Sequence, residues 1–207
     1  MKTFSLALIR FLFFFFAFGV SLYALQYFNF RTDTNILSSK PADLSAQWPW
    51  RIGFYGHITA GILALCIGPF QFLRKFRAKN LPLHRRFGKI YVLAILAGSI
   101  CAFYAALFAN EGIIAQTGFM GLAVAWFYTT LRAYQTIRKG DLPGHKRWMV
   151  RSYACTMAAV TLRIWLPLGM VGFHFSFHDT YRAVAWLCWV PNLFVAEWLI
   201  YSKKFEY

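Results

Sequence analysis

The stretch RKFRAKNLPLHRRFGKIY, residues 74–91, decides how the chain is organised, because it is a dense cationic run between two long apolar segments. It contains no acidic residue and a single histidine, His84, near its middle. Lysine and arginine in short loops beside apolar segments mark the cytoplasmic side of a membrane protein. The stretch therefore predicts that the chain crosses a membrane and that residues 74–91 face the cytoplasm.

The overall composition agrees with a membrane protein. Of the 207 residues 59% are hydrophobic and 20% aromatic, and the mean hydropathy is +0.47. A soluble domain of this size could not cover so much apolar surface. The net charge of +15 would suggest nucleic acid in a soluble protein. Here most of the charge lies in loops beside apolar segments, so we expect membrane lipids as partners and no nucleic acid.

The apolar segments define the predicted fold. Each is long enough to cross a bilayer, which takes about 20 residues. The sequence predicts an all-α membrane protein with six transmembrane helices, a four- to five-helix core bundle, and cytoplasmic N- and C-termini. We divide it into an N-terminal membrane helix with an external loop, residues 1–50, and a five-helix membrane core domain, residues 51–207. The predicted helices cover residues 11–30, 52–73, 87–108, 113–137, 148–171 and 183–201.

A second cationic loop, RKGDLPGHKRW at residues 138–148, carries His145. It resembles the first loop in the order of its parts, as LPLHRRFG and LPGHKRWM show. In the six-helix topology both loops lie on the cytoplasmic side, together with Lys203 and Lys204. His84 and His145 should therefore precede their helices at a similar depth.

One predicted ion pair follows from the depth of charged residues, because a helix rises about 1.5 Å per residue. Glu197 and Arg151 both lie a few residues from the cytoplasmic ends of their helices. Glu197 should pair with Arg151 or with Arg132, as a structural ion pair between helices.

Arg163 lies more than three turns further out, near the level of His57. Charged side chains at membrane depth are costly and by default face a protein interior or a cavity. Arg163 is left with three possible partners: Asn192, a backbone carbonyl, or an anionic ligand group.

The histidines are candidate ligands of haem b, since two imidazoles from facing helices can bind the iron axially. His84 and His145 form the better pair, and His57 with His174 forms a weaker one on the opposite side. His57 and His84 cannot share a metal in this topology. Apart from haem iron we expect no metal. The haem propionates would be neutralised by Arg85, Arg86, Lys146 and Arg147, with Arg163 as a further candidate.

Four segments carry a resemblance to a known family: HITAGILALCIGPFQF from His57, HRRFGKIY from His84, GHKRWMVRSYACTMAAVTLR from Gly144, and WLCWVPNLFVAEW from Trp186. Over about residues 50–201 the chain resembles an uncharacterised bacterial family of multi-pass membrane proteins, one of the domain-of-unknown-function families. The resemblance implies a fold and a location in the bacterial inner (cytoplasmic) membrane. It implies no activity.

A looser similarity is to the di-haem cytochromes b of transmembrane reductases, whose four core helices carry four haem-ligating histidines. The chain departs from that pattern, because residues 113–137 contain no histidine.

Three hypotheses for function stay open. The first is a cytochrome b-like electron-transfer protein, a membrane oxidoreductase with a redox partner or quinone. The second is a binding or transport protein in which the two histidine-containing loops form one cationic pocket for an anionic lipid or ligand. The third is a structural membrane subunit, and a homo-oligomer is compatible with all three.

Overall fold

A computed structural model describes residues 2–29 and 35–202, and every regular element in these ranges is helical. The predicted cytoplasmic Lys203 and Lys204 lie outside the described residues. In chain order the elements are α1 (Lys2–Ala24), η1 (Leu25–Asn29), α2 (Asn35–Ser38), α3 (Ala42–Ala46), α4 (Trp48–Gln71), α5 (Arg74–Lys79), α6 (Leu81–Ala106), α7 (Ile113–Arg138), α8 (Leu142–Thr156), α9 (Ala158–Pro167), η2 (Leu168–Gly172), α10 (Phe177–Leu187) and α11 (Val190–Tyr201).

Within the described residues, five helical segments are long and apolar enough to cross a membrane, so the chain is an integral, all-helical membrane protein. The helix predicted over residues 113–137 is α7, which is 26 residues long but lies outside this set. Its polar side chains, such as Gln116 and Gln135, make it less apolar than these five segments. The five segments are Phe11–Asn29, Trp48–Gln71, Leu81–Ala106, Leu142–Gly172 and Phe177–Tyr201.

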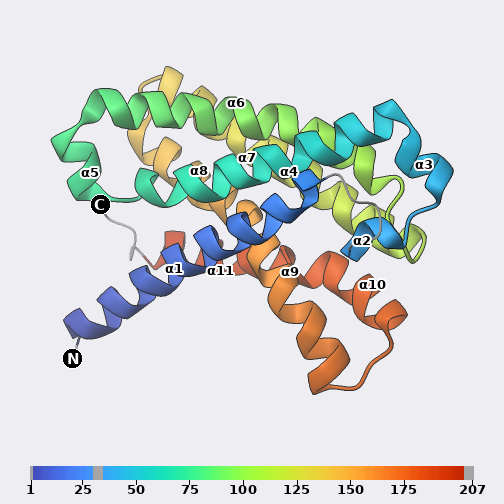
Figure 1. The fold of residues 1–207 in the computed structure, drawn as a ribbon. Coiled ribbons are helices and arrows are strands. Elements are labelled where there is room, and N and C mark those ends of the chain that lie inside the picture. The colour runs from blue at the N-terminus through green and yellow to red at the C-terminus, as the bar shows by residue number, and fades with distance from the viewer. Residues whose placement is uncertain (1, 30–34, 203–207) are drawn as a thin grey trace.

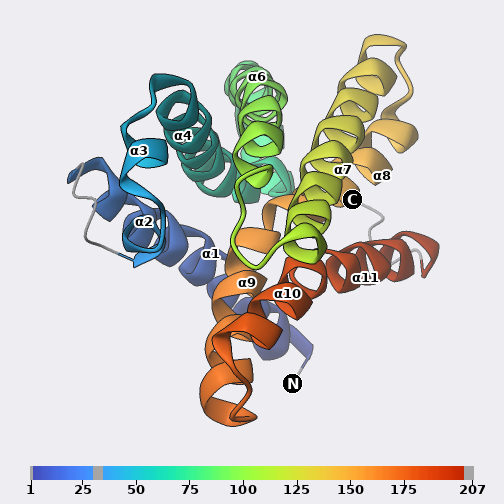
Figure 2. The ribbon, with the colours of Figure 1, turned by 90° about the vertical axis from the view of Figure 1, so that its right-hand side faces the viewer.

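The core of the molecule is a bundle of α4, α6, α7 and α8, in which α4 packs against α6, α6 against α7, and α7 against α8 (Figures 1 and 2). Small residues allow the closest of these contacts. A β-carbon added to Gly98 would lie 2.1 Å from Cβ of Ala60, and one added to Gly68 would lie 2.0 Å from the ring of Tyr153. Such close approach is how membrane helices pack without a hydrophobic driving force between them.

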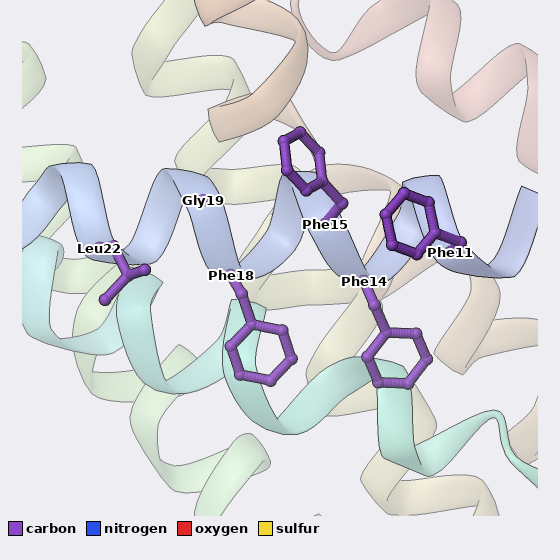
Figure 3. Close-up of a pocket in the computed structure, with 6 residues that line it drawn as sticks. All are labelled: Phe11, Phe14, Phe15, Phe18, Gly19 and Leu22. Carbon is purple, nitrogen blue, oxygen red and sulfur yellow. The ribbon is translucent and has the colours of Figure 1, made fainter.

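α1 runs diagonally across α4 and also contacts α9 (Figure 1). Aromatic rings hold it there, with Phe14 at 5.5 Å from Phe70 and Phe13 at 5.1 Å from Tyr153 between ring centroids. A shallow apolar hollow lies beside α1, and Figure 3 shows the side chains that line it. The hollow is lined by Phe11, Phe14, Phe15, Phe18, Gly19 and Leu22.

The predictions for the last two helices are wrong in detail, because each of these helices is interrupted in the structure. The helix predicted over residues 148–171 consists of α8, α9 and the single π turn η2, with a break at Met157. The helix predicted over residues 183–201 consists of α10 and α11. Pro191 stands in the first turn of α11, where a backbone N–H has no partner within the helix, so its absence costs nothing. In a continuous helix over residues 183–201 the same proline would remove one backbone hydrogen bond.

Candidate functional site

The two candidate haem histidines lie inside helices, in the first turns of α6 and α8. The prediction had placed both in loops before helices that begin at residues 87 and 148, and this was wrong. Two local signals start each helix earlier. Asn80 caps α6 by accepting a hydrogen bond from Leu83 N at 3.1 Å, and Asp141 caps α8 by accepting one from Gly144 N at 2.8 Å. Each cap is followed by a proline, Pro82 or Pro143, which suits the first turn of a helix.

The structure brings His84 and His145 together at one end of the bundle. The two imidazoles lie within electrostatic range of one another, and Arg77 on α5 lies within range of both. Arg85 also acts on His84. We call the end that contains α5 and the starts of α6 and α8 the cationic end.

Hydrogen bonding distinguishes the two imidazoles. Nδ1 of His145 lies 2.8 Å from the carbonyl oxygen of Ala133. Since a carbonyl only accepts, Nδ1 donates this bond and Nε2 stays available for another partner. Nδ1 of His84 is buried and has no hydrogen-bond partner among the described residues.

The surface around these histidines is strongly positive. Arg85 and Arg147 are both exposed, while Arg77 and the two imidazoles are half-buried. The acidic residue of the second loop, Asp141, caps α8 through Gly144. The arrangement therefore concentrates cationic and imidazole donors without a described acidic partner.

The other two candidate histidines have different surroundings. His57, on α4, packs edge-on against Trp126 of α7, with 6.2 Å between ring centroids. The charge that acts on it comes from Arg163. His174 is exposed in the segment between η2 and α10, at a φ of 57°. Arg163, on α9, thus lies within electrostatic range of His57.

Arg163 takes the second of its three predicted partners. Its Nη1 donates to the carbonyl oxygen of Ala159 at 2.7 Å, and its guanidinium lies 5.1 Å from the ring centroid of Tyr23. Asn192 is engaged elsewhere, because its amide donates to the Ala154 carbonyl at 3.2 Å and to the Thr161 hydroxyl at 3.1 Å.

The predicted ion pair between Arg151 and Glu197 is present. Arg151 Nε lies 2.5 Å from Glu197 Oε1, and Nη2 lies 2.7 Å from Oε2, so the pair is bidentate. Trp148 lies beneath the Arg151 guanidinium at 4.6 Å, and Arg132 lies 5.5 Å from the same ring. The contact joins α8 to α11.

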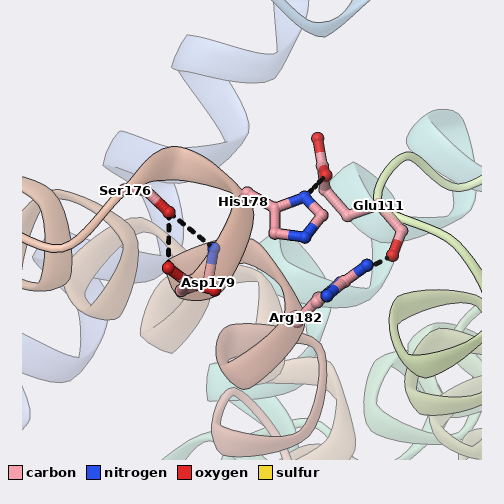
Figure 4. A network of polar contacts seen from close by, with 5 residues as sticks. All are labelled: Glu111, Ser176, His178, Asp179 and Arg182. Atoms are coloured by element: carbon pink, nitrogen blue, oxygen red, sulfur yellow. Dashed lines mark hydrogen bonds and ion pairs between the residues drawn. The ribbon is translucent and has the colours of Figure 1, made fainter.

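At the opposite end, a polar network joins the turn after α6 to the start of α10 (Figure 4). The imidazole of His178 binds the carboxylate of Glu111, and Arg182 Nε donates to the Glu111 carbonyl oxygen at 3.0 Å. Ser176 caps α10 by accepting from Asp179 N at 3.1 Å. Within the described part of the chain, no three His, Cys, Asp or Glu residues are grouped so that they could hold a metal ion.

A family model with the description "Predicted membrane protein (DUF2306)" matches residues 54–200. The chain belongs to this family. Membership carries a membrane location but no activity, since the family is one of unknown function. No curated protein and no solved structure matches the chain. The similarity to di-haem cytochromes b therefore has no support from these comparisons.

The part of this DUF2306 member that sequence reasoning missed is a buried hydroxyl network between α6, α7 and α8. Tyr91 OH lies 3.0 Å from Ser152 Oγ and 3.2 Å from Thr156 Oγ1. Thr130 Oγ1 lies 2.7 Å from Ser152 Oγ, and Trp126 Nε1 donates to Thr156 Oγ1 at 2.9 Å. The available signal was the spacing of Ser152 and Thr156, which stand four residues apart on one helix face.

Proposed function

We propose that this DUF2306 member is a six-helix protein of the bacterial inner membrane that binds an anionic group at its cationic end. The group is the phosphate of a lipid head group or of another anionic ligand. The observation that carries the proposal is the gathering of Arg77, His84 and His145, with no described acidic partner. A half-buried guanidinium without an acidic partner is costly, and a bound anion would offset that cost.

The exposed rim strengthens the proposal. Arg85, Arg86 and Arg147 are exposed and follow His84 or His145 within two residues along the chain. Basic residues near an anionic membrane surface contribute about 1 kcal/mol each to attraction of acidic lipids. The rim would therefore collect anionic head groups, and the half-buried side chains would bind one of them by hydrogen bonds.

The test compares two arginines of the same short helix. Arg77 is half-buried against the histidines, whereas Arg74 is exposed. We expect native mass spectrometry of the purified protein to show bound phosphatidylglycerol that is lost in Arg77→Gln and retained in Arg74→Gln. Competition by inorganic phosphate would identify a soluble anion as the ligand. Equal loss in both variants would mean unspecific attraction to a basic surface and would overturn the proposal.

The orientation of the bundle is part of the proposal. The positive-inside rule places the cationic end in the cytoplasm. With α7 as a sixth crossing both termini lie on the same side, and with five crossings they lie on opposite sides. Reporter fusions at each end, active only in the cytoplasm, should both be active. One active and one inactive fusion would contradict six crossings.

Haem b between His84 and His145 is a second candidate, and the observation that favours it is the hydrogen bond from His145 Nδ1 to Ala133. This bond would leave Nε2 free for iron, and Arg85 and Arg147 would be placed to neutralise propionates. Bound haem would supply one-electron transfer, as in a membrane oxidoreductase. An absorption spectrum of the purified protein decides between the candidates, because haem b requires a Soret band that His145→Ala removes.

A further inference from the structure

A second site lies deeper in the membrane, where α1, α4 and α9 meet. Arg163 is the residue on which it depends. Its Nε is buried and has no hydrogen-bond partner, and its contacts are the Ala159 carbonyl of its own helix and the ring of Tyr23. A cation at membrane depth normally has a partner of opposite charge.

That partner is missing among the residues that the structure describes. The acidic side chains lie elsewhere: Glu197 binds Arg151, Glu111 binds His178, Asp141 binds the Gly144 amide, Asp179 binds Ser176, and Asp43 lies in α3. The positive charge of Arg163 is therefore not balanced by any of them.

A second unpartnered group lies beside Arg163. His57 is the residue with which the Arg163 charge interacts, and its Nδ1 is buried without a hydrogen-bond partner. Two buried nitrogens on two different helices, α4 and α9, thus lack partners and lie within electrostatic range of one another. A ligand with a negatively charged oxygen would satisfy both.

The chain also leaves room there. α4 has four glycines, and a β-carbon added to Gly53, Gly56 or Gly68 would meet a neighbour within 2.8 Å or less, whereas one added to Gly61 would meet no atom within 4 Å. Gly61 stands one turn after His57, on the same face of the helix. It is open space beside His57 and is not a packing glycine.

The contacts of the next turn of α4 show on which side of the helix this space lies. Leu65 packs against Ala17 and Val20 of α1 and against Val160 of α9. Gly61 stands one turn before Leu65, and Arg163 stands one turn after Val160. The open space therefore lies on the side of α4 that faces α1 and α9, toward Arg163.

We infer that His57, Gly61 and Arg163 form a binding site for the carboxylate or phosphate head group of an anionic amphiphile. The amphiphile would enter from the lipid between α1 and α9, because the Tyr23 ring that covers the guanidinium is 47% exposed. The site is separate from the cluster at the cationic end and does not depend on it.

The test uses two glycines at which an added β-carbon has room. Leucine at Gly61 fills the proposed site, and leucine at Gly19, which also meets no atom within 4 Å, adds the same bulk to α1 beside its outer hollow. Binding to the purified protein is measured with oleate as a carboxylate probe, phosphatidylglycerol as a phosphate probe, and phosphatidylcholine as a zwitterionic control. The stronger of the two anionic probes identifies the head group.

We expect Gly61→Leu and Arg163→Gln each to weaken binding of the anionic probe by roughly tenfold or more. Gly19→Leu should leave the affinity for this probe unchanged. In an Arg77→Gln background, Gly61→Leu should still weaken the remaining binding of the anionic probe, which separates this site from the one at the cationic end. If Gly61→Leu fails to fold, Arg163→Gln and its charge-preserving variant Arg163→Lys provide the comparison. Equal affinity for phosphatidylcholine, or equal binding in the Gly61→Leu and Gly19→Leu variants, would overturn the inference.

Discussion

Replacing Gly98 with alanine should force α4 and α6 apart. The added methyl carbon would lie 2.1 Å from Cβ of Ala60, whereas ordinary van der Waals contact begins at 3.4 Å. The helices must therefore separate locally by more than about 1 Å, because side-chain interiors are close-packed and Ala60 has no rotamer that avoids the contact.

The expected cost has two parts of opposite sign. Overpacking a well-packed interior costs about 1–3 kcal/mol. Alanine is the better helix former, and gains up to about 1 kcal/mol over glycine in a helix. The net loss should be about 1–2 kcal/mol, equivalent to a fall of about 2–8 °C in unfolding temperature for a chain of this size.

A double-mutant cycle isolates the contact. Ala60→Gly removes the methyl group that the new one would meet, so the double variant Ala60→Gly/Gly98→Ala moves one methyl group from α4 to α6. Its stability should approach that of the wild type, with a coupling energy of about 1–3 kcal/mol.

Thermal unfolding in one detergent measures all four members of the cycle. Gly61→Ala is the matched control on α4, because its added carbon meets no atom within 4 Å. The reasoning fails if Gly98→Ala is no less stable than Gly61→Ala, or if Ala60→Gly does not rescue Gly98→Ala.

Three further predictions concern polar groups. Glu197→Gln should lower stability by about 1–3 kcal/mol in thermal unfolding, because it neutralises the bidentate partner of Arg151; an unchanged unfolding temperature would rule out an ion pair that holds α11 on α8. Burial lowers the pKa of Lys40 from 10.5, so the unfolded chain binds more protons below pH 10.5 and stability should rise with pH toward that value. Denaturation of Lys40→Met should lack this rise, and an identical slope in both proteins would be the contrary result. Ser152→Ala should cost about 1–3 kcal/mol by removing a partner of Tyr91, and adding Tyr91→Phe should cost less than the sum of the single changes; strict additivity would contradict a shared network.

Local signals in the sequence were strong enough to predict several parts of the fold. Depth along antiparallel helices was sufficient to pair Glu197 with Arg151, since both lie near the same ends of their helices. The same reasoning placed Arg163 at the level of His57. The starts of α6 and α8 were missed because Asn80 with Pro82, and Asp141 with Pro143, were taken for loop residues, whereas their capping and fixed φ begin a helix.

The sequence by itself determined that the chain is a membrane protein. Its apolar segments and basic loops follow from the composition and order of the residues, which do not depend on how the helices pack. Only the tertiary structure decided which polar groups meet. Arg77 joins His84 and His145 because α5 folds back beside them, and Gly61 is open while Gly68 is filled by Tyr153 because different helices cover neighbouring turns of α4. The sequence of a helix does not say which neighbouring helix covers each of its faces, because that depends on how the helices pack.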